Sequence, residues 1–204
     1  MQSDREWHQQ QNQIENLLSS KLGLNRTLGA RKCHSVVLEG VQARQLLSQW
    51  HLQGWTPAHR CYALAHNQQP VMIVTVGKSR FQKKYQYELL RLASQPGINI
   101  VGGLSKLMKF IREDLGHCAI VSYCDRSKSN GQGYLAAGFE LEGATDPGYF
   151  WTDGTTQLSR YQSQKKNLAR HLANYCPEKS ESQNMFDHGW RRYWDCGHWM
   201  FVYR

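Results

Sequence analysis

The sequence has no apolar run long enough to cross a bilayer, which takes about 20 consecutive apolar residues. Its first seven residues are polar in character and include acidic side chains, so they lack the apolar stretch of a secretory signal. We therefore expect no membrane partner and a cytoplasmic location.

Paired cysteines are also missing. Six cysteines are present, but none forms a Cys-x-x-Cys pair, and the nearest two, Cys118 and Cys124, lie six positions apart. Because structural zinc sites need closely paired ligands, we expect none here and interpret the cysteines as small, reduced core residues. The chain has no His-Asn-His zinc frame and no paired Gly-Ile-Tyr motif, which counts against nuclease activity but not against DNA binding.

Acidic residues are scarce relative to basic ones: 16 Asp and Glu stand against 25 Lys and Arg, for a formal net charge of +9. A basic surplus of this size favours an anionic partner. Charge alone leaves nucleic acid, a phosphorylated cofactor, or both as candidates.

The hydrophobic pattern divides the chain into three parts. Residues 1–30 are rich in Gln, Asn and Ser and predict an arm with a short helix at 15–22. Residues 31–155 predict a core in which strands outnumber helices and are interleaved with them, so the fold class is mixed α/β. Residues 156–204 predict an extension with a long basic helix over 158–175 and a last strand, 199–203, that returns to the core.

Within the core, the apolar spacing predicts helices over 41–50, 105–114 and 132–137. Strands are predicted at 34–38, 60–65, 71–76, 87–92, 99–101, 117–123, 139–141 and 148–151, with a hairpin turn at 66–69. In the extension, Ser180 and Gln183 have the spacing of a capping box.

A glycine turn between a strand and a helix is the first candidate site. Glycine lets the backbone approach a ligand closely, and the exposed N–H groups at a helix start bind phosphate. This turn is therefore a candidate pyrophosphate cradle. Its residues are Val101, Gly102, Gly103, Leu104, Ser105 and Lys106.

About thirty residues later comes the string from Tyr134 to Gly138-Phe139. The order of strand, glycine turn, helix, strand, helix ending in Tyr-x-x-x-Gly-Phe, and strand resembles the GNAT acyltransferase superfamily. The resemblance implies a mixed, mostly antiparallel central sheet flanked by helices, an acyl-CoA cofactor, and Tyr134 as a general acid near the cofactor sulfur. Leu104 stands where the family turn has glycine or alanine.

A second resemblance covers most of residues 33–204. Strings at 50–54, 87–91, 101–107, 122–126, 147–150, 159–162 and 193–197 resemble a phage-borne family described as homing-endonuclease-like or DNA-modification-like. The related Mom-type enzymes are GNAT-fold proteins that modify adenine in phage DNA with an acyl-CoA-derived group. This implies a DNA-modifying acyltransferase acting in the cytoplasm of a host cell.

An adenine amino group is a poor nucleophile, so its modification needs a positioned base or a metal ion. His51 follows the first core helix, and Asp125 follows a buried strand. Both are candidates for proton transfer, alongside Tyr134, or for holding a divalent metal ion. The alternatives are a helix-end histidine and a turn aspartate.

Basic and aromatic residues concentrate in the last third and in one earlier cluster. Lys and Arg neutralise phosphates, and aromatic rings stack on bases. Seven tryptophans exceed what a core of this size usually uses. The predicted nucleic-acid-binding residues are Lys78, Arg80, Arg160, Lys165, Lys166, Arg191, Arg192 and Tyr193.

Three functions remain open. The leading hypothesis is a GNAT-like acyltransferase that modifies nucleic-acid bases. The alternatives are a nuclease or DNA-binding module of a homing element, and a GNAT that acetylates a small amine or a protein.

Overall fold

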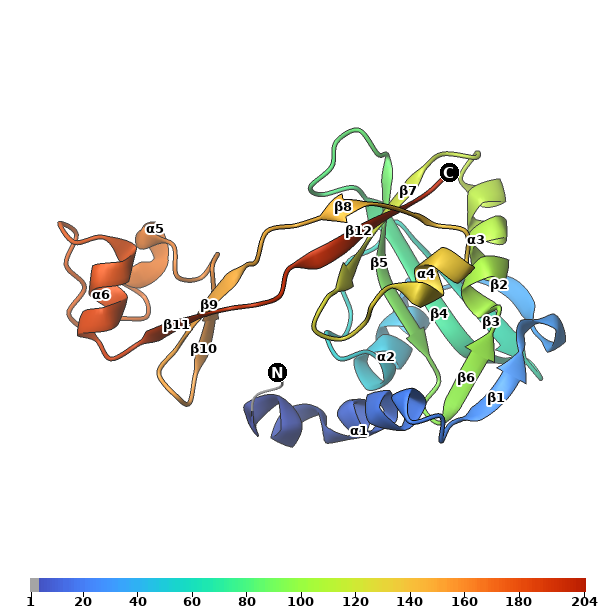
Figure 1. Cartoon of the computed structure of the whole chain (residues 1–204), viewed down its shortest axis with the longest axis horizontal. Coiled ribbons are helices and arrows are strands. Elements are labelled where there is room, and N and C mark those ends of the chain that lie inside the picture. The colour runs from blue at the N-terminus through green and yellow to red at the C-terminus, as the bar shows by residue number, and fades with distance from the viewer. Residues whose placement is uncertain (1–3) are drawn as a thin grey trace. The chain divides into compact units, whose positions relative to one another are not determined.

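The computed structural model describes residues 4–204 and divides into two compact units. The large unit comprises the chain up to Cys124 together with Ser129–Gly143 and Trp199–Arg204. The small unit comprises Asp125–Lys128 and Ala144–His198. Figure 1 labels the elements of both. None of the helices that the structure describes is long and apolar enough to span a bilayer.

A seven-stranded sheet forms the centre of the large unit, in the order β2-β3-β4-β5-β7-β12-β8. Its strands are β2 (His34–Leu38), β3 (Arg60–His66), β4 (Gln69–Lys78), β5 (Tyr87–Ser94), β7 (Ile120–Asp125), β8 (Glu140–Ala144) and β12 (His198–Tyr203). Neighbours from β2 to β5 are antiparallel, whereas β5 and β7 are parallel. The predicted mixed, mostly antiparallel sheet is confirmed.

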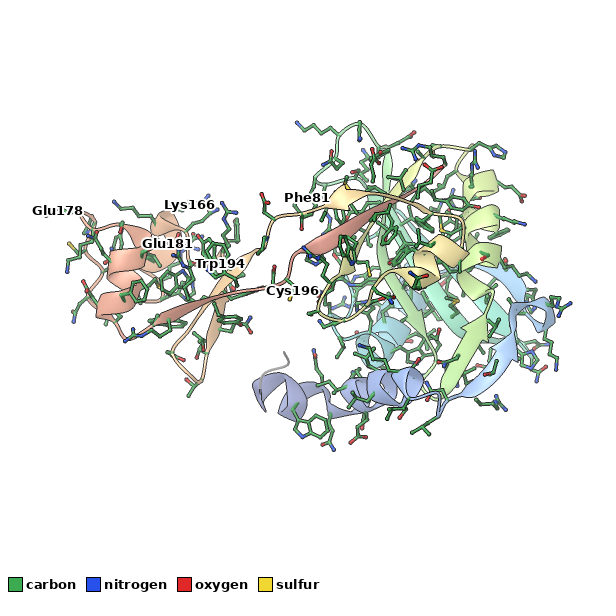
Figure 2. The ribbon with its side chains drawn as sticks, in the orientation of Figure 1. Phe81, Lys166, Glu178, Glu181, Trp194 and Cys196 are labelled. Carbon is green, nitrogen blue, oxygen red and sulfur yellow. The ribbon has the colours of Figure 1, made fainter. Side chains whose placement is uncertain are left out.

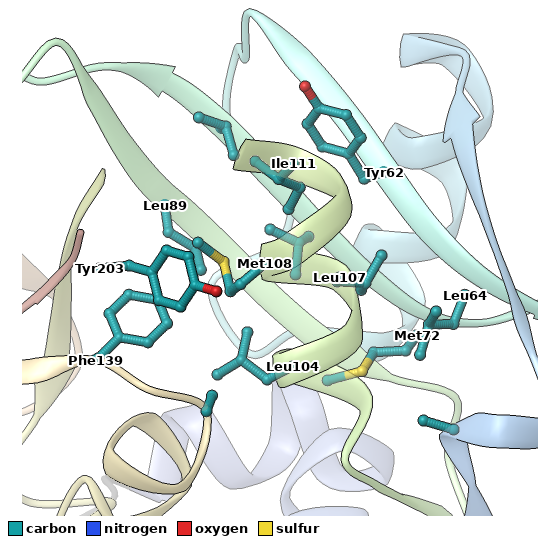
Figure 3. Packing of buried hydrophobic residues seen from close by; sticks show 14 of the residues in the cluster. Tyr62, Leu64, Met72, Leu89, Leu104, Leu107, Met108, Ile111, Phe139 and Tyr203 are labelled. Carbon is teal, nitrogen blue, oxygen red and sulfur yellow. The ribbon is translucent and has the colours of Figure 1, made fainter. Parts of the chain in front are cut away.

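Helices cover both faces of this sheet. Successive side chains of β3 are apolar and point to opposite faces, so both faces need cover. Tyr62 and Leu64 pack with α3 (Gly103–Asp114), while Cys61 and Ala63 pack with α2 (Gly40–Trp50). Figure 3 shows the α3 side, where Leu104, Leu107, Met108 and Ile111 meet the strands. The predicted helix periodicity of α3 therefore points its apolar face into the larger core.

Shorter elements complete the large unit. They are β1 (Arg26–Gly29), the 3-10 helix η1 (Ala30–Lys32), β6 (Ile98–Val101), which pairs in parallel with β1, and α4 (Gln132–Ala136). The turn between β3 and β4 has left-handed backbone at Asn67 and Gln68, as two-residue hairpins require. The predicted hairpin is thus present.

The N-terminal segment is not a separate arm. Helix α1 spans Asp4–Lys21 with one non-helical residue at Gln10, and so is longer than predicted. Ile14 is buried, Gln10 donates to the carbonyl oxygen of Leu52 at 2.6 Å, and Asn16 accepts from the backbone N–H of Gly97 at 2.8 Å. These contacts join the segment to the large unit despite its polar composition.

The small unit has its own sheet and core. Strand β9 (Tyr149–Thr152) lies between β10 (Gln157–Ser159) and β11 (Arg191–Trp194), all antiparallel. Because β9 pairs with these later strands, the main segment of the small unit begins at Ala144, before the predicted boundary at 155. Helix α6 (Glu181–Asp187) begins with the predicted Ser180–Gln183 capping box.

The predicted long helix over 158–175 is wrong. Leu158 pairs with Trp151 in the sheet, and the only helix in that stretch is α5, Lys165–Leu168. The side chain of Gln162 accepts hydrogen bonds from the backbone and hydroxyl of Ser159 and so turns the chain. Leu158, Leu168 and Leu172 are buried as predicted, but Tyr161 is exposed.

Candidate functional site

The glycine turn lies between β6 and α3, as the sequence predicts. Gly102 has a φ of 73°, in the left-handed region that side chains rarely adopt. A Cβ on Gly103 would lie 2.5 Å from Met72 Sδ and 2.8 Å from Ile100 Cγ2. The two glycines therefore have different tasks: Gly102 reverses the chain, and Gly103 lets the helix start against the sheet.

The start of α3 faces this turn. The first helical backbone bond runs from the Lys106 N–H to the Gly102 carbonyl oxygen at 3.1 Å. The N–H groups that precede it have no partner within the helix, and the helix dipole places partial positive charge there. Such a terminus favours an anionic group such as phosphate.

A cavity of about 460 Å³, here called the cationic pocket, opens beside the turn. Three basic side chains line it: Arg31 of η1, and Lys106 and Lys109 of α3. The Lys106 ammonium donates to the carbonyl oxygens of Ala30 and Cys33, at 3.2 Å for Ala30. Lys106 thus fixes η1 against α3, while Arg31 and Lys109 are exposed.

A second cavity of about 370 Å³, the inner groove, adjoins the same turn and shares Gly102 and Ser105 with the cationic pocket. β5 pairs with β7 only over Tyr87–Leu89, and Leu92, farther along β5, lines the groove. The rest of its lining comes from β4, β6, α3 and the α4 region: Met72, Ile100, Gly103, Leu104, Ser129, Gly133, Tyr134, Ala136 and Ala137. The groove is therefore mostly apolar, with few polar groups.

Tyr134 is one of the residues that line the inner groove. Its ring stacks on Phe201 with centroids 5.0 Å apart and meets Phe139 edge-on at 5.1 Å. The hydroxyl accepts a hydrogen bond from Ser122 Oγ at 3.1 Å. Burial raises the pKa of Tyr134 to about 12, so the phenol is neutral at physiological pH and retains its proton.

The sheet order, the parallel β5–β7 pair, the glycine turn before α3 and the Tyr134–Phe139 segment after β7 are now established. This is the order of elements that the resemblance to the GNAT superfamily implies. No protein-family model matches the chain, and no curated protein matches it.

A comparison with solved structures found two distant matches. A Bacillus subtilis acetyltransferase in complex with CoA is 14% identical, with a TM-score of 0.48, covering 84% of this chain and 98% of that one. The Escherichia coli ribosomal-protein-S18-alanine N-acetyltransferase is 16% identical, with a TM-score of 0.43, covering 55% of this chain and 80% of that one. Both TM-scores are too low for either match to assign the fold or the site, and both rest on this chain's own residues.

His51 lies at the end of α2, outside the residues that line either cavity. Its backbone N–H donates to the Leu47 carbonyl oxygen, and its Nδ1 accepts from the backbone N–H of Gln53 at 3.0 Å. These bonds give His51 the geometry of a helix-end histidine, which is the alternative to a role in proton transfer or metal binding.

Asp125 lies at the end of β7 and belongs to the small unit. Its Oδ1 accepts from the backbone and hydroxyl of Ser127, at 2.9 and 2.6 Å, and its Oδ2 pairs with Lys128 at 3.1 Å. Burial acts to raise its pKa, but the bonds from Ser127 and Lys128 outweigh that effect and lower it. The structure thus gives Asp125 a turn-forming arrangement.

The two candidate metal ligands therefore lie in different units. Among residues 4–204, as far as their side chains are described, no group of three or more His, Cys, Asp or Glu is placed to hold a metal ion.

The predicted nucleic-acid-binding residues fall on both units. Lys78 and Arg80 belong to the large unit; Arg160, Lys165, Lys166, Arg191, Arg192 and Tyr193 belong to the small unit. Arg192 lies 5.2–5.6 Å from the ring centroids of Tyr149, Trp151 and Trp194. Trp151 and Trp190 are core residues, so the abundance of tryptophan is explained in part by packing.

Sequence reasoning missed Arg31, Lys109 and Ser122. Lys106 and Lys109 are spaced i, i+3, which puts them on one helix face, so the second lysine was recoverable from the pattern. Arg31 and Ser122 reach the site only through folding, because each lies far along the chain from the glycine turn.

Proposed function

We propose that the protein transfers an acyl group from an acyl-CoA to an amine, and that the acceptor is a nucleic-acid base, specifically the exocyclic amine of adenine in DNA. The observation that carries the acyl-CoA part is the meeting of the cationic pocket and the inner groove at Gly102. A phosphorylated carrier with a long, mostly apolar arm needs both environments side by side.

The residues present fit such a carrier. The start of α3, with Arg31 and Lys109 beside it, suits the phosphate groups. The apolar lining of the inner groove suits the arm and excludes water. The carrier, when bound, would supply an activated thioester.

Tyr134 is then the proton donor at the inner groove. As the new N–C bond forms and the C–S bond of the bound carrier breaks, the phenol would give its proton to the departing sulfur, and the proton that the amine loses would return to the phenolate. Ser122 holds the phenol oxygen in place. The high pKa of Tyr134 suits a donor that must stay protonated until the bond breaks.

Two features support a nucleic-acid acceptor. The net charge of +9 favours a polyanion, and the cation–aromatic pairs around Tyr149 and Arg192 are a chemistry suited to phosphates and bases. His51 and Asp125, the other residues that the sequence offered for proton transfer, line neither cavity, so this step does not use them.

Titration calorimetry with CoA tests the first part. Lys109→Gln is expected to weaken binding about tenfold, because it removes a charged partner of phosphate. Lys21→Gln, a matched exposed lysine of α1, leaves it unchanged. Equal affinities for both variants would contradict the pocket assignment.

Mass analysis of nucleosides from cells that express the protein tests the acceptor. The expected result is an acyl-sized increase on adenine that Tyr134→Phe strongly reduces. CoA binding with unaltered nucleosides would place the acceptor outside DNA and favour a small amine or a protein.

A further inference from the structure

The loop that joins β4 to β5, residues 79–86, carries an aromatic ring on a basic background. Phe81 is 72% exposed, and Figure 2 labels it on this loop. Between Lys78 and Tyr87 the sequence has four basic residues and no acidic one. The basic residues are Lys78, Arg80, Lys83 and Lys84.

The loop is held in one shape by a buried carboxylate. Glu88 is 1% exposed, and its Oε1 accepts from Arg80 Nη2 at 2.5 Å and from Nε at 3.2 Å. Its Oε2 accepts from the backbone N–H of Arg80 at 3.0 Å. Because a buried carboxylate is costly unless it is fully paired, these three bonds strongly favour this loop conformation.

Further bonds fix the rest of the loop. The Ser79 N–H donates to the Gln86 carbonyl oxygen at 3.1 Å, and Ser79 Oγ donates to that of Gln82 at 2.9 Å. Lys84 and the Tyr85 hydroxyl both bind Glu142 of β8. Phe81, which follows Arg80, is therefore carried on a preorganised loop.

The exposed Phe81 ring contacts two neighbouring side chains. It meets the ring of Tyr123 on β7 edge-on, with centroids 5.9 Å apart, and the Arg80 guanidinium lies 5.4 Å from its centroid. Tyr123 directly follows Ser122, whose hydroxyl binds Tyr134. The exposed ring thus contacts the strand that carries Ser122, although adjacent side chains of a strand point to opposite faces of the sheet.

We propose that Phe81 is a wedge that inserts between stacked bases of DNA, with Lys78 and Lys83 on the flanking phosphates. Apolar side chains on rigid loops unstack base steps in this way, and an amine inside a duplex must be extruded before it can be modified. The proposal rests on the proposed function for its purpose, but the wedge acts on DNA without acyl-CoA.

An anionic membrane would also attract a basic loop with an aromatic residue. Membrane binding, however, scales with the apolar area that is inserted, and a single ring flanked by Gln82 and Lys83 offers little. One rigid ring is sufficient to separate one base step. The loop therefore fits nucleic acid better than lipid.

A DNA duplex with 2-aminopurine in place of adenine tests the wedge, because its fluorescence rises when the base unstacks. The full-length protein is expected to raise the fluorescence, and Phe81→Ala to abolish most of the rise and weaken binding about tenfold. The control Leu24→Ala removes a similarly exposed apolar side chain and leaves both unchanged. A rise that survives Phe81→Ala would overturn the proposal, as would its absence with the unaltered protein.

Replacing Lys78 and Lys83 with Gln is expected to reduce the slope of log affinity against log salt by about two, one for each phosphate contact. An unchanged slope would show that the two lysines do not contact phosphates. Phe81-dependent binding to phosphatidylserine vesicles, without duplex unstacking, would overturn the proposal in favour of a membrane.

CoA calorimetry on Phe81→Ala separates this proposal from the proposed function. Unchanged CoA affinity is expected. Phe81-dependent unstacking in a protein that binds no CoA would keep the wedge and reject the transferase, whereas CoA binding without unstacking would do the reverse.

Discussion

The hydroxyl of Ser122, a fully buried residue of β7, donates a hydrogen bond to the hydroxyl of Tyr134 on α4, at 3.1 Å. The two residues are twelve positions apart. Their contact joins the central sheet to a residue that lines the inner groove, and the phenol oxygen is the acceptor in it.

The raised pKa of Tyr134 predicts a loss of stability in base. The folded state holds the phenolic proton more tightly than the unfolded chain, in which the tyrosine pKa is about 10. That stability is complete below pH 10 and is lost as pH rises through about 12, amounting to about 2–3 kcal/mol.

Urea unfolding of the protein and of Tyr134→Phe between pH 8 and 12 measures this effect, because the other tyrosines contribute equally to both. The stability difference between them is expected to shrink across that window. A constant difference would show that the phenol titrates at its ordinary pKa.

The two glycines of the turn are expected to respond differently to alanine. Gly103→Ala should destabilise the protein by about 1–3 kcal/mol through overpacking against Met72 and Ile100. A Cβ on Gly102 would lie in open space, with the nearest atom, Ala30 Cβ, at 3.9 Å. Gly102→Ala should therefore lower the free energy of unfolding by about 1–2 kcal/mol through backbone strain alone.

A second substitution distinguishes these causes. Met72→Ala should partly rescue Gly103→Ala but not Gly102→Ala, as a double-mutant cycle in thermal unfolding would show. Rescue of both, or of neither, would contradict the packing explanation.

Thr75 on β4 is fully buried, and its hydroxyl has no hydrogen-bond partner among the residues described. Thr75→Val keeps the shape and removes the unsatisfied group, so it should raise the free energy of unfolding by about 1–2 kcal/mol. Thr152→Val is the control. The hydroxyl of Thr152 donates to the Thr156 carbonyl oxygen at 2.9 Å, so its removal should lower the free energy of unfolding. A destabilising Thr75→Val would imply a bound water at that hydroxyl.

One carboxylate oxygen organises the small unit. Glu181 Oε1 accepts from Trp151 Nε1 at 2.9 Å, from the Tyr149 hydroxyl at 3.0 Å and from Ser163 Oγ at 3.3 Å (Figure 2 labels Glu181). Glu181→Ala leaves the Trp151 indole N–H and the Tyr149 hydroxyl without this acceptor, while Ser163 Oγ keeps the Arg160 carbonyl oxygen at 3.3 Å, and the change should destabilise this unit by about 2–4 kcal/mol.

Limited proteolysis gives the readout for Glu181→Ala, with faster cleavage expected within residues 144–198 than within the large unit. Glu178→Ala, an exposed neighbour, should cleave at the original rate. Similar cleavage of the two variants would mean that the three bonds add little to stability.

The sequence correctly predicted those elements whose apolar spacing is compatible with only one type of secondary structure. The apolar spacing of Leu107, Met108 and Ile111 specifies a helix face, and a strand such as β3 alternates its side chains between two cores. The stretch 158–175 failed because the spacing of Leu158, Leu168 and Leu172 is compatible with a helix and equally with a strand followed by turns. Pairing with β9 decided between them.

The mixed α/β class, the glycine turn at Gly102 and Gly103, and the position of Tyr134 on a short helix could be predicted from the chain, because each depends on neighbouring residues. Which side chains share the site depends on how distant segments fold together. Arg31 joins Lys106 and Lys109, and Ser122 joins Tyr134, through sheet pairing and helix packing between distant segments. Such contacts leave no periodic signal in the chain, since their geometry is set by burial rather than by spacing.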